Sequence, residues 1–270
     1  MATFRGWPDS RRDPAPMQGP GGWPAVGNSA GWPTLAPKRL DTTDPLAVGL
    51  VGWWPLNEGS GIVARDWSLN RNHGAFTNIG NVRPSGWGMN DGLRAAAGLW
   101  LDGSNDYITV QHSAALAITG PVSVVQWHWP TSFAAGWWEP LRKSTSGYPR
   151  CYAFSIEQIS GRLYFGRGTG SSQTYMASSG VETLNAWNCA IGVNSGATWA
   201  TYLNGIKTVA TPGTPTVTDD GAAFYIGSRG SSCCWFPGAI AHTRIYNRAL
   251  TDAEAARIWA DPWAGATAAG

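Results

Sequence analysis

Paired carboxylates are the first chemistry to look for in this sequence, and the spacing that glycoside hydrolysis needs is missing. A retaining glycosidase built on a β-sandwich places two carboxylates at short even spacing on one strand, so that both face the same cleft. Glu157 stands alone in its expected strand, and Asp219-Asp220 lie in an expected loop. We therefore predict no catalytic residues and no enzyme activity.

One segment matches the sequence motif of a serine nucleophile but lacks the structural context that the motif requires. Residues 27–31, GNSAG, match the pattern G-x-S-x-G, but a nucleophile elbow needs a strand before it and a helix after it. Here the pattern lies in a proline-rich stretch that can form neither. We interpret it as a chance match, and the metalloprotease, phosphate-loop and dinucleotide patterns are likewise absent in their required context.

Oxygen ligands for a cation are offered by two loops. Asp102 and Asp106 flank a tight turn, and the stretch Asp66–His73 is rich in Asn and Asp. Such side chains commonly hydrogen-bond their own backbone, and turn chemistry is the expected role. Calcium is the alternative, because carboxylate oxygens are its preferred ligands. The prediction is therefore no cofactor, with calcium kept open and no metal ligand assigned.

The four cysteines do not have the spacing of a metal site. Cys151 and Cys189 lie in strand-like runs and are expected to be buried thiols, with a bridge between them as the alternative. Cys233 and Cys234 are adjacent in an expected loop beside Trp235. Exposure there would make one of them a reactive thiol.

Seventeen tryptophans are more than a core of this size needs. Tryptophan combines a large apolar area with one hydrogen-bond donor, so an excess indicates contact surfaces for sugars or for protein neighbours. Trp137 and Trp138 follow Gly136 in an expected loop, and Trp235 follows the cysteine pair. These three are the candidate glycan-binding residues.

Residues 1–45 are predicted to form an extended arm. Gly-Trp-Pro recurs three times, and Pro both fixes its own backbone and pushes the preceding residue towards extended conformations. Such a stretch forms neither a helix nor a central strand. Disordered tails are poor in aromatic residues, so we interpret Trp7, Trp23 and Trp32 as anchors to a neighbouring subunit or to the chain's own domain. A linker or disordered tail is the alternative.

The remaining elements are predicted to be short strands with one helix. The run Val122–Trp129 alternates as a strand, with Trp127 filling the core and His128 on the outer sheet face. Asn204-Gly205 is a strong hairpin signal, and strands recur every 8 to 12 residues, as in a sandwich.

Near the C-terminus, residues 236–246 read as a strand inside a sheet, with two period-2 faces. One face is expected to hold Ile240, His242, Arg244 and Tyr246, and the other Ala239, Ala241, Thr243 and Ile245. Thr251 and Glu254 form a capping box, so a helix is predicted from about Asp252 to Trp259.

Five segments in order resemble the laminin-G-like, concanavalin A-like jelly-roll family: residues 53–61 (WWPLNEGSG), 66–74 (DWSLNRNHG), 99–110 (LWLDGSNDYITV), 202–205 (YLNG) and 236–259. The resemblance implies an all-β, two-sheet jelly-roll sandwich with one short C-terminal helix, and it allows carbohydrate binding. Two positions depart from the pattern. Ala241 replaces a usual acidic residue, which removes a potential calcium ligand, and Asn188 replaces a usual histidine.

The expected organisation is an arm at 1–45, one jelly-roll domain at 46–263 and a small-residue tail at 264–270. The formal net charge of +2 and the scattered basic residues predict no nucleic-acid partner and no polybasic membrane patch. Met1–Asp13 has no apolar run of signal-peptide length, and no segment reads as a membrane span. Synthesis in a cytosol is therefore expected.

Two functions fit these observations. The first is a non-enzymatic structural or decoration protein of a bacteriophage virion, made in the host cytoplasm. In it the jelly roll faces outward, and the arm joins it to other subunits, most simply in a homo-oligomer such as a trimer. The alternative is a lectin-like carbohydrate-binding module with an extracellular location. A virion protein that also adheres to cell-surface glycans is compatible with both.

Overall fold

The fold is that of a computed structural model, which describes residues 38–80, 85–87, 98–133, 136–144, 151–169, 171–213 and 216–268. Trp7, Trp23 and Trp32 of the expected arm lie outside the described residues, as does the GNSAG stretch.

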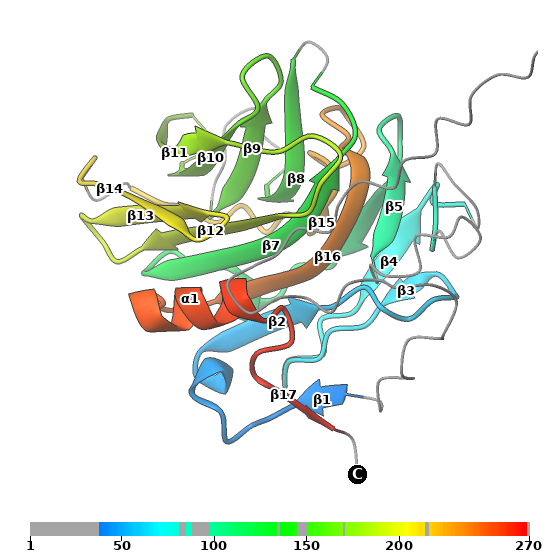
Figure 1. The fold of residues 1–270 in the computed structure, drawn as a ribbon, viewed down its shortest axis with the longest axis horizontal. Helices are drawn as coiled ribbons and strands as arrows, with labels where there is room; N and C mark the ends of the chain where they lie inside the picture. The colour runs from blue at the N-terminus through cyan, green and yellow to red at the C-terminus, as the bar shows by residue number, and fades with distance from the viewer. Residues whose placement is uncertain are drawn as a thin grey trace, which may run out of the picture.

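Two antiparallel sheets form the body of the protein (Figure 1), as the jelly-roll prediction requires. In the described residues, the larger sheet has eight strands in the order β11 (Gln173–Val181), β10 (Arg162–Gly168), β9 (Ala153–Glu157), β8 (Trp137–Lys143), β15 (Phe224–Ile226), β6 (Tyr107–Val110), β4 (Gly74–Thr77) and β3 (Val63–Ala64). The other has the order β14 (Ile206–Ala210), β13 (Trp199–Leu203), β12 (Asn188–Asn194), β7 (Val122–Pro130), β16 (Pro237–Tyr246) and β2 (Leu50–Trp54), and β5 (Leu99–Asp102) also pairs with β16. Short 3-10 helices lie at Pro45–Ala47 and Ala114–Leu116.

The main core fills the space between the sheets. Val122 and Val124 of β7 point into it, and so do Phe154 of β9 and Phe165 of β10. Gly192 of β12 lies against these rings, because a Cβ there would come within 2.5 Å of the Phe165 ring. The absence of a side chain at this position lets the aromatic rings pack directly onto the opposing strand.

The central strand β16 contains a bulge that the alternating pattern did not reveal. His242 has φ +46°, and the pairing of β16 with β7 shifts between Ala241 and Arg244. Ile240 therefore faces the main core, whereas Arg244 and Tyr246 lie on the other side of the sheet. The prediction that these residues share one face was wrong, because a bulge inserts one residue and reverses the alternation beyond it.

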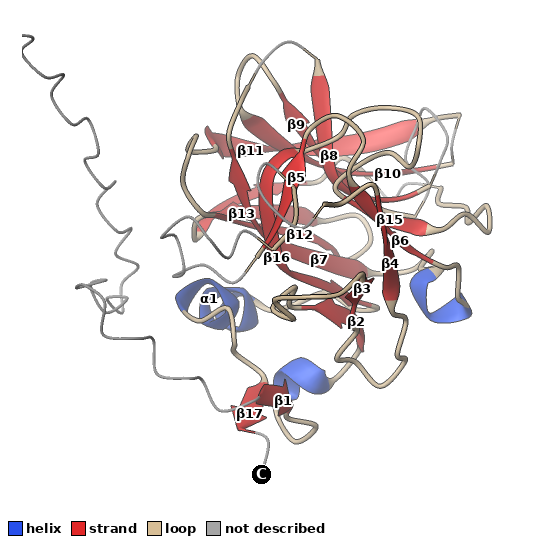
Figure 2. Ribbon diagram, turned by 90° about the vertical axis from the view of Figure 1, so that its right-hand side faces the viewer, coloured by secondary structure: helices blue, strands red, loops and turns tan. Residues whose placement is uncertain are grey.

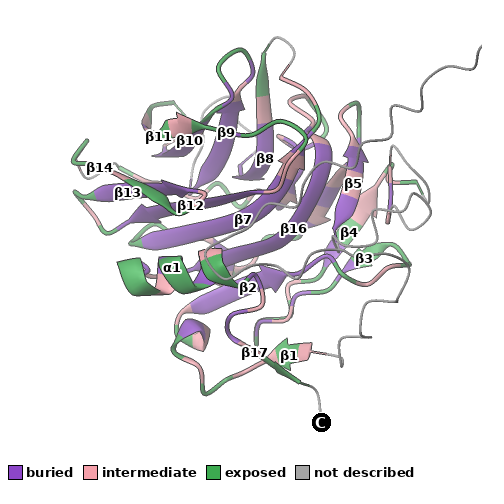
Figure 3. Cartoon of the chain, viewed as in Figure 1, coloured by how far each residue is buried: buried purple, intermediate pink, exposed green. Residues whose placement is uncertain are grey.

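The helix α1 (Asp252–Ala260) covers the outer face of the sheet that contains β7 and β16. Figure 3 shows these strands as buried and the outward side of the helix as exposed. Its capping box is present, with Thr251 and Glu254 each bonded to the other's backbone, as predicted. Ala255 and Ile258 belong to a second apolar cluster, in which Trp127 of β7 stacks on Trp259 at 5.6 Å and 11°. This contact explains the burial of Trp127, which lies under the helix rather than between the sheets.

His128 was expected on the outer face of its sheet, and this prediction was wrong. Its side chain is fully buried on the inner side of β7, where Nε2 lies 2.8 Å from Glu182 Oε1. It also meets the ring of Phe236, which belongs to the main core. A buried carboxylate provides the polar partner that allows a histidine to replace an apolar residue here.

The two ends of the described chain pair with each other at the base of the molecule, as Figure 2 shows. Strand β1 (Lys38–Leu40) lies antiparallel to β17 (Ala266–Ala268). Next to them, Trp53, Trp67 and Trp263 form an aromatic cluster, and the guanidinium of Arg244 lies 3.9 Å from the centre of the Trp53 ring. Regular strand pairing thus includes residues 38–40 of the predicted arm and residues 266–268 of the predicted tail.

No helix among the described residues is both long and apolar enough to cross a membrane.

Candidate functional site

The Asp66 loop serves its own backbone. Asp66 Oδ1 accepts hydrogen bonds from the backbone N–H groups of Trp53 at 2.9 Å and Ser68 at 2.8 Å. Oδ2 accepts from the Ser68 hydroxyl and from the Asn72 N–H, both at 2.8 Å. Both carboxylate oxygens are therefore used to fix the loop against β2, which confirms turn chemistry.

The second acidic loop has the same character. Asp102 Oδ1 accepts from the Ser104 N–H at 2.8 Å, and Asp106 Oδ2 accepts from the Asp102 N–H at 2.9 Å. With alanine at position 241 and no cluster of three or more His, Cys, Asp or Glu side chains in the described residues, this donor set does not fit a calcium ion, which takes six to eight oxygens.

The outer face of the eight-stranded sheet carries an aromatic surface, which we call the aromatic face: Trp137, Tyr164 and Tyr175. The strand register brings the three rings together from β8, β10 and β11. Tyr164 meets Trp137 at 5.3 Å and Tyr175 at 6.2 Å, both edge to face. Trp137 is 43% exposed, and burial raises the pKa of Tyr175, which keeps its hydroxyl protonated.

Glycine shapes this surface from below. Gly166 is the cross-strand partner of Tyr175, and a Cβ on Gly166 would come within 2.1 Å of the Tyr175 ring. The tyrosine therefore lies over bare backbone. Further along the same sheet, Tyr107 and Tyr225 meet edge to face at 6.1 Å. Aromatic side chains thus occur along this sheet from β11 to β6.

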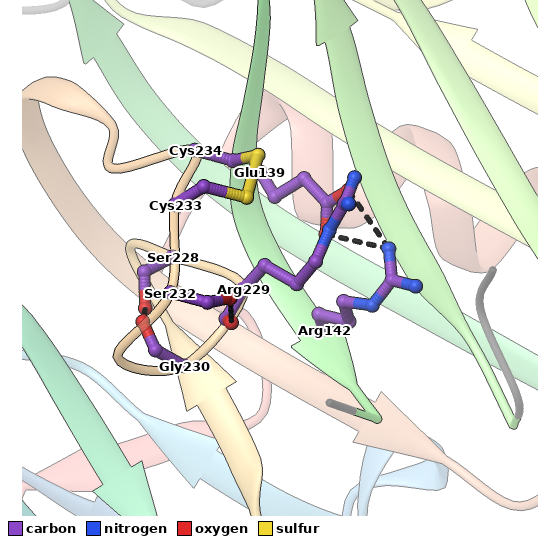
Figure 4. Close-up of a disulfide and its surroundings, with 8 residues drawn as sticks. All are labelled: Glu139, Arg142, Ser228, Arg229, Gly230, Ser232, Cys233 and Cys234. Atoms are coloured by element: carbon purple, nitrogen blue, oxygen red, sulfur yellow. Dashed lines mark hydrogen bonds and ion pairs between the residues drawn. A yellow bond between two sulfur atoms is a disulfide. The ribbon is translucent and has the colours of Figure 1, made fainter. Parts of the chain in front are cut away.

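Glu139 and Arg142 of β8 form an ion cluster with Arg229 next to the aromatic face. Figure 4 shows the three side chains of this cluster. Glu139 is buried, and Arg142 Nη1 donates to both of its oxygens, at 2.8 and 2.7 Å. Arg229, from the loop after β15, donates to Glu139 Oε1 through Nε at 3.0 Å and through Nη2. Two guanidinium groups thus share the single carboxylate of Glu139.

The loop that supplies Arg229 also holds a disulfide between the adjacent residues Cys233 and Cys234. The expectation of a reactive thiol there was wrong, since each cysteine takes the other as its partner. Cys151 and Cys189 are free and buried, as predicted. Burial raises the pKa of Cys151 to about 12 and also raises that of Cys189, so both stay protonated and unreactive.

The three candidate tryptophans do not form one surface. Trp137 and Trp138 open strand β8 instead of lying in a loop, and neighbouring residues of a strand point to opposite faces. Trp138 packs against the main core and donates its Nε1–H to the Ser132 carbonyl at 3.2 Å. Trp235 is half-buried in the disulfide loop. Of the three, Trp137 alone joins the aromatic face.

Most of the residues around Trp137 were not predicted from the sequence. Tyr164 and Tyr175 are separated from it along the chain and meet it only through strand pairing. A signal was available, because Arg162–Phe165 and Gln173–Ala177 were expected strands, and a tyrosine lies in each. The pairing of Glu139 with Arg229, 90 residues apart, leaves no comparable trace in the sequence.

A family model described as "Concanavalin A-like lectin/glucanases superfamily" matches residues 102–256. Among curated proteins none matches the sequence.

Solved structures share the fold at low sequence identity. Trypanosoma rangeli sialidase in complex with sialic acid has a TM-score of 0.59 and 15% identity, over 80% of this chain and 33% of the sialidase. The binding domain of Paraclostridial Mosquitocidal Protein 1 has a TM-score of 0.58 and 14% identity, over 80% of this chain and 53% of that domain. This chain thus corresponds to only part of these two structures. Domain 4 of AbnA, an extracellular arabinanase from Geobacillus stearothermophilus, in complex with arabinotriose, has a TM-score of 0.57 and 17% identity, over 76% of this chain and 96% of that domain.

Proposed function

The chain belongs to the concanavalin A-like lectin/glucanases superfamily, and we propose that it is a carbohydrate-binding protein that holds a glycan on the outer face of its eight-stranded sheet. The observation that carries the proposal is the aromatic face, where strand register brings Trp137, Tyr164 and Tyr175 into edge-to-face contact. The outer face of the other sheet is covered by α1.

The chemistry of the aromatic face suits a sugar. A pyranose ring has a face of C–H groups, which gains from contact with the flat apolar area of tryptophan and tyrosine. Its hydroxyl groups need polar partners at fixed positions, as in most small-molecule sites. Arg229, held by Glu139 two residues after Trp137 on β8, can supply a donor from its partly exposed guanidinium. No part of this proposal requires a catalytic step.

Two of the similar structures contain a sugar, namely sialic acid and arabinotriose. These ligands belong to those proteins. Sandwiches of the same fold therefore occur in proteins that bind glycans. This favours the lectin-like function, which was the alternative predicted from the sequence, over the virion role.

A glycan array followed by titration calorimetry tests the proposal. The intact protein should bind at least one glycan class, and Trp137→Ala should weaken that binding about tenfold or more, the loss typical of a central aromatic contact. Leu69→Ala is the matched control, since Leu69 is also exposed, at 75%, but belongs to the Asp66 loop. A blank array with folded protein, or equal losses in both variants, would refute the proposal.

The virion decoration role draws no support from the described residues. The anchoring residues proposed for it, Trp7, Trp23 and Trp32, lie outside them, and the homo-oligomer remains a prediction. The virion location, its extracellular alternative and the absence of enzyme activity also remain predictions.

A further inference from the structure

We propose that the Cys233–Cys234 disulfide positions Arg229 on the proposed glycan-binding face, so that glycan affinity depends on the oxidation state of these two cysteines. The inference rests on the proposed function and adds a positioning element and a means of regulation to the same site.

The disulfide is bonded through its backbone to both partners of an ion pair. The Glu139 N–H donates to the Cys234 carbonyl at 3.0 Å, and the Arg229 N–H donates to the Cys233 carbonyl at 3.2 Å. The side chains of Glu139 and Arg229 are themselves bonded to each other. The cysteine pair therefore connects the backbone of β8 with the loop after β15, and the charged side chains of these two segments meet over the sheet (Figure 4).

The conformation of the loop depends on the closed ring. Cys234 has φ +67°, in the left-handed region that residues other than Gly, Asn and Asp seldom adopt. The Sγ–Sγ bond spans a single peptide unit, so the two cysteines cannot change their backbone angles independently while it is closed. Once it opens, Cys234 is free to return to an extended conformation, which turns its carbonyl away from the Glu139 N–H.

Two further contacts explain why the change would reach Arg229. The Ser228 hydroxyl donates to the Gly230 carbonyl at 2.9 Å, and the Ser232 hydroxyl donates to the Arg229 carbonyl at 3.1 Å. These bonds keep residues 228–232 together as a tight turn. When the Cys233 carbonyl moves, the turn that carries Arg229 loses its attachment and moves with it.

Arg229 has donors to spare for a ligand. Its Nε and Nη2 bond to Glu139 Oε1, and within the described residues Nη1 has no partner. The side chain is 22% exposed, and its partner Glu139 lies two residues after Trp137 on the same strand. A guanidinium so placed can donate to a sugar hydroxyl or carboxylate lying on the aromatic face.

The redox step is a simple thiol–disulfide exchange. A dithiol reductant such as dithiothreitol gives two electrons and two protons to the Cys233–Cys234 bond, which becomes two thiols, while the reductant closes its own disulfide. Cys151 and Cys189 are buried and protonated. Reduction and alkylation in the folded protein should therefore occur at positions 233 and 234.

The test measures affinity for a glycan from the array in the oxidised, reduced and reoxidised protein. We expect about tenfold weaker binding after reduction, as for the loss of one charge-assisted contact, and full recovery on reoxidation. Cys233→Ser with Cys234→Ser should bind like the reduced protein and ignore dithiothreitol. Mass spectrometry after alkylation verifies the state of each cysteine.

A second variant separates positioning from general stability. Arg229→Met should lower the affinity of the oxidised protein to the reduced value, and reduction should lower it no further. Equal affinity in both redox states, a further loss in reduced Arg229→Met, or free thiols at 233 and 234 in aerobically purified protein would overturn the inference and leave the proposed function intact. If the oxidised protein binds no glycan, the proposed function fails and the inference fails with it.

Discussion

Glu254 provides the sharpest test of how the helix is held on the sandwich. Its carboxylate accepts the Thr251 N–H at 2.8 Å, closing the capping box, and takes Arg248 Nη1 at 2.8 Å and Nη2 at 2.6 Å. Arg248 also donates to the Val48 carbonyl at 2.7 Å. The Arg248 side chain thus connects Glu254, at the start of α1, with the loop before β2.

The expected loss of stability can be divided between these two contacts. Losing a cap typically costs about 1 kcal/mol, and a two-point ion pair that is mostly shielded from water adds about 1 kcal/mol. Glu254→Ala should therefore lower the free energy of unfolding by about 2 kcal/mol. Glu254→Gln keeps an oxygen for the Thr251 N–H and loses the charge, so about 1 kcal/mol is expected.

The charge of Glu254 also predicts a pH dependence. The hydrogen bond from Arg248 lowers the pKa of Glu254 below its usual value of 4.5. A carboxyl whose pKa is lower in the folded state adds stability above its unfolded pKa, and this contribution disappears as the pH falls through the folded pKa. The stability difference between wild type and Glu254→Gln should therefore shrink below about pH 4.5.

Urea denaturation followed by tryptophan fluorescence, at pH 7 and pH 3.5, measures these differences. Arg257→Gln is a suitable control, because Arg257 lies on the same helix and pairs with Asp44 in a more exposed position. If Glu254→Ala costs less than about 0.5 kcal/mol, the level of ordinary surface substitutions, then neither contact contributes as argued.

Three other changes test separate parts of the molecule. Gly192→Ala should destabilise the protein by about 1–3 kcal/mol through overpacking against Phe165, and an unchanged urea midpoint would show that the rings move aside. Asp66→Ala should cost about 3 kcal/mol, because three backbone N–H groups lose their acceptor; equal thermal stability would argue that water replaces the carboxylate. Light scattering of the full chain beside a fragment of residues 38–270, which keeps β1, tests the arm: an oligomer that becomes a monomer supports it as an assembly device, and identical masses count against that role.

Local signals in the sequence were reliable where chemistry acts over a few residues. Thr251 and Glu254 predicted the start of α1 because a capping box involves only neighbouring groups. The Asp66 loop was likewise understood from side chains that bond nearby backbone. The bulge at His242 was not predicted. It depends on how β16 pairs with β2 and β7, and the sequence of a single strand does not determine that pairing.

The candidate site was only partly predictable for the same reason. The pair Trp137-Trp138 could be selected because it follows Gly136. Which of the two tryptophans is exposed depends on the position where β8 begins, and the sequence did not predict that position. Tyr164 and Tyr175 join Trp137 through the register of three strands, which is a long-range property. The bond between Cys233 and Cys234 was missed because adjacent cysteines were treated as separate thiols.

The pairing of β1 with β17 has a practical consequence for joining this protein to others. Lys38 and Ala268 are direct cross-strand partners, so the two ends of the described chain lie only a few ångströms apart. In Figures 1 and 2, β1 and β17 lie at the opposite end of the molecule from β8. A short linker between them and a new opening at the Asn204-Gly205 turn would give a circular permutant with the same fold. In a fragment that begins at Lys38, a surface or a second protein can therefore be fused before Lys38 or after Ala268 while the aromatic face stays accessible.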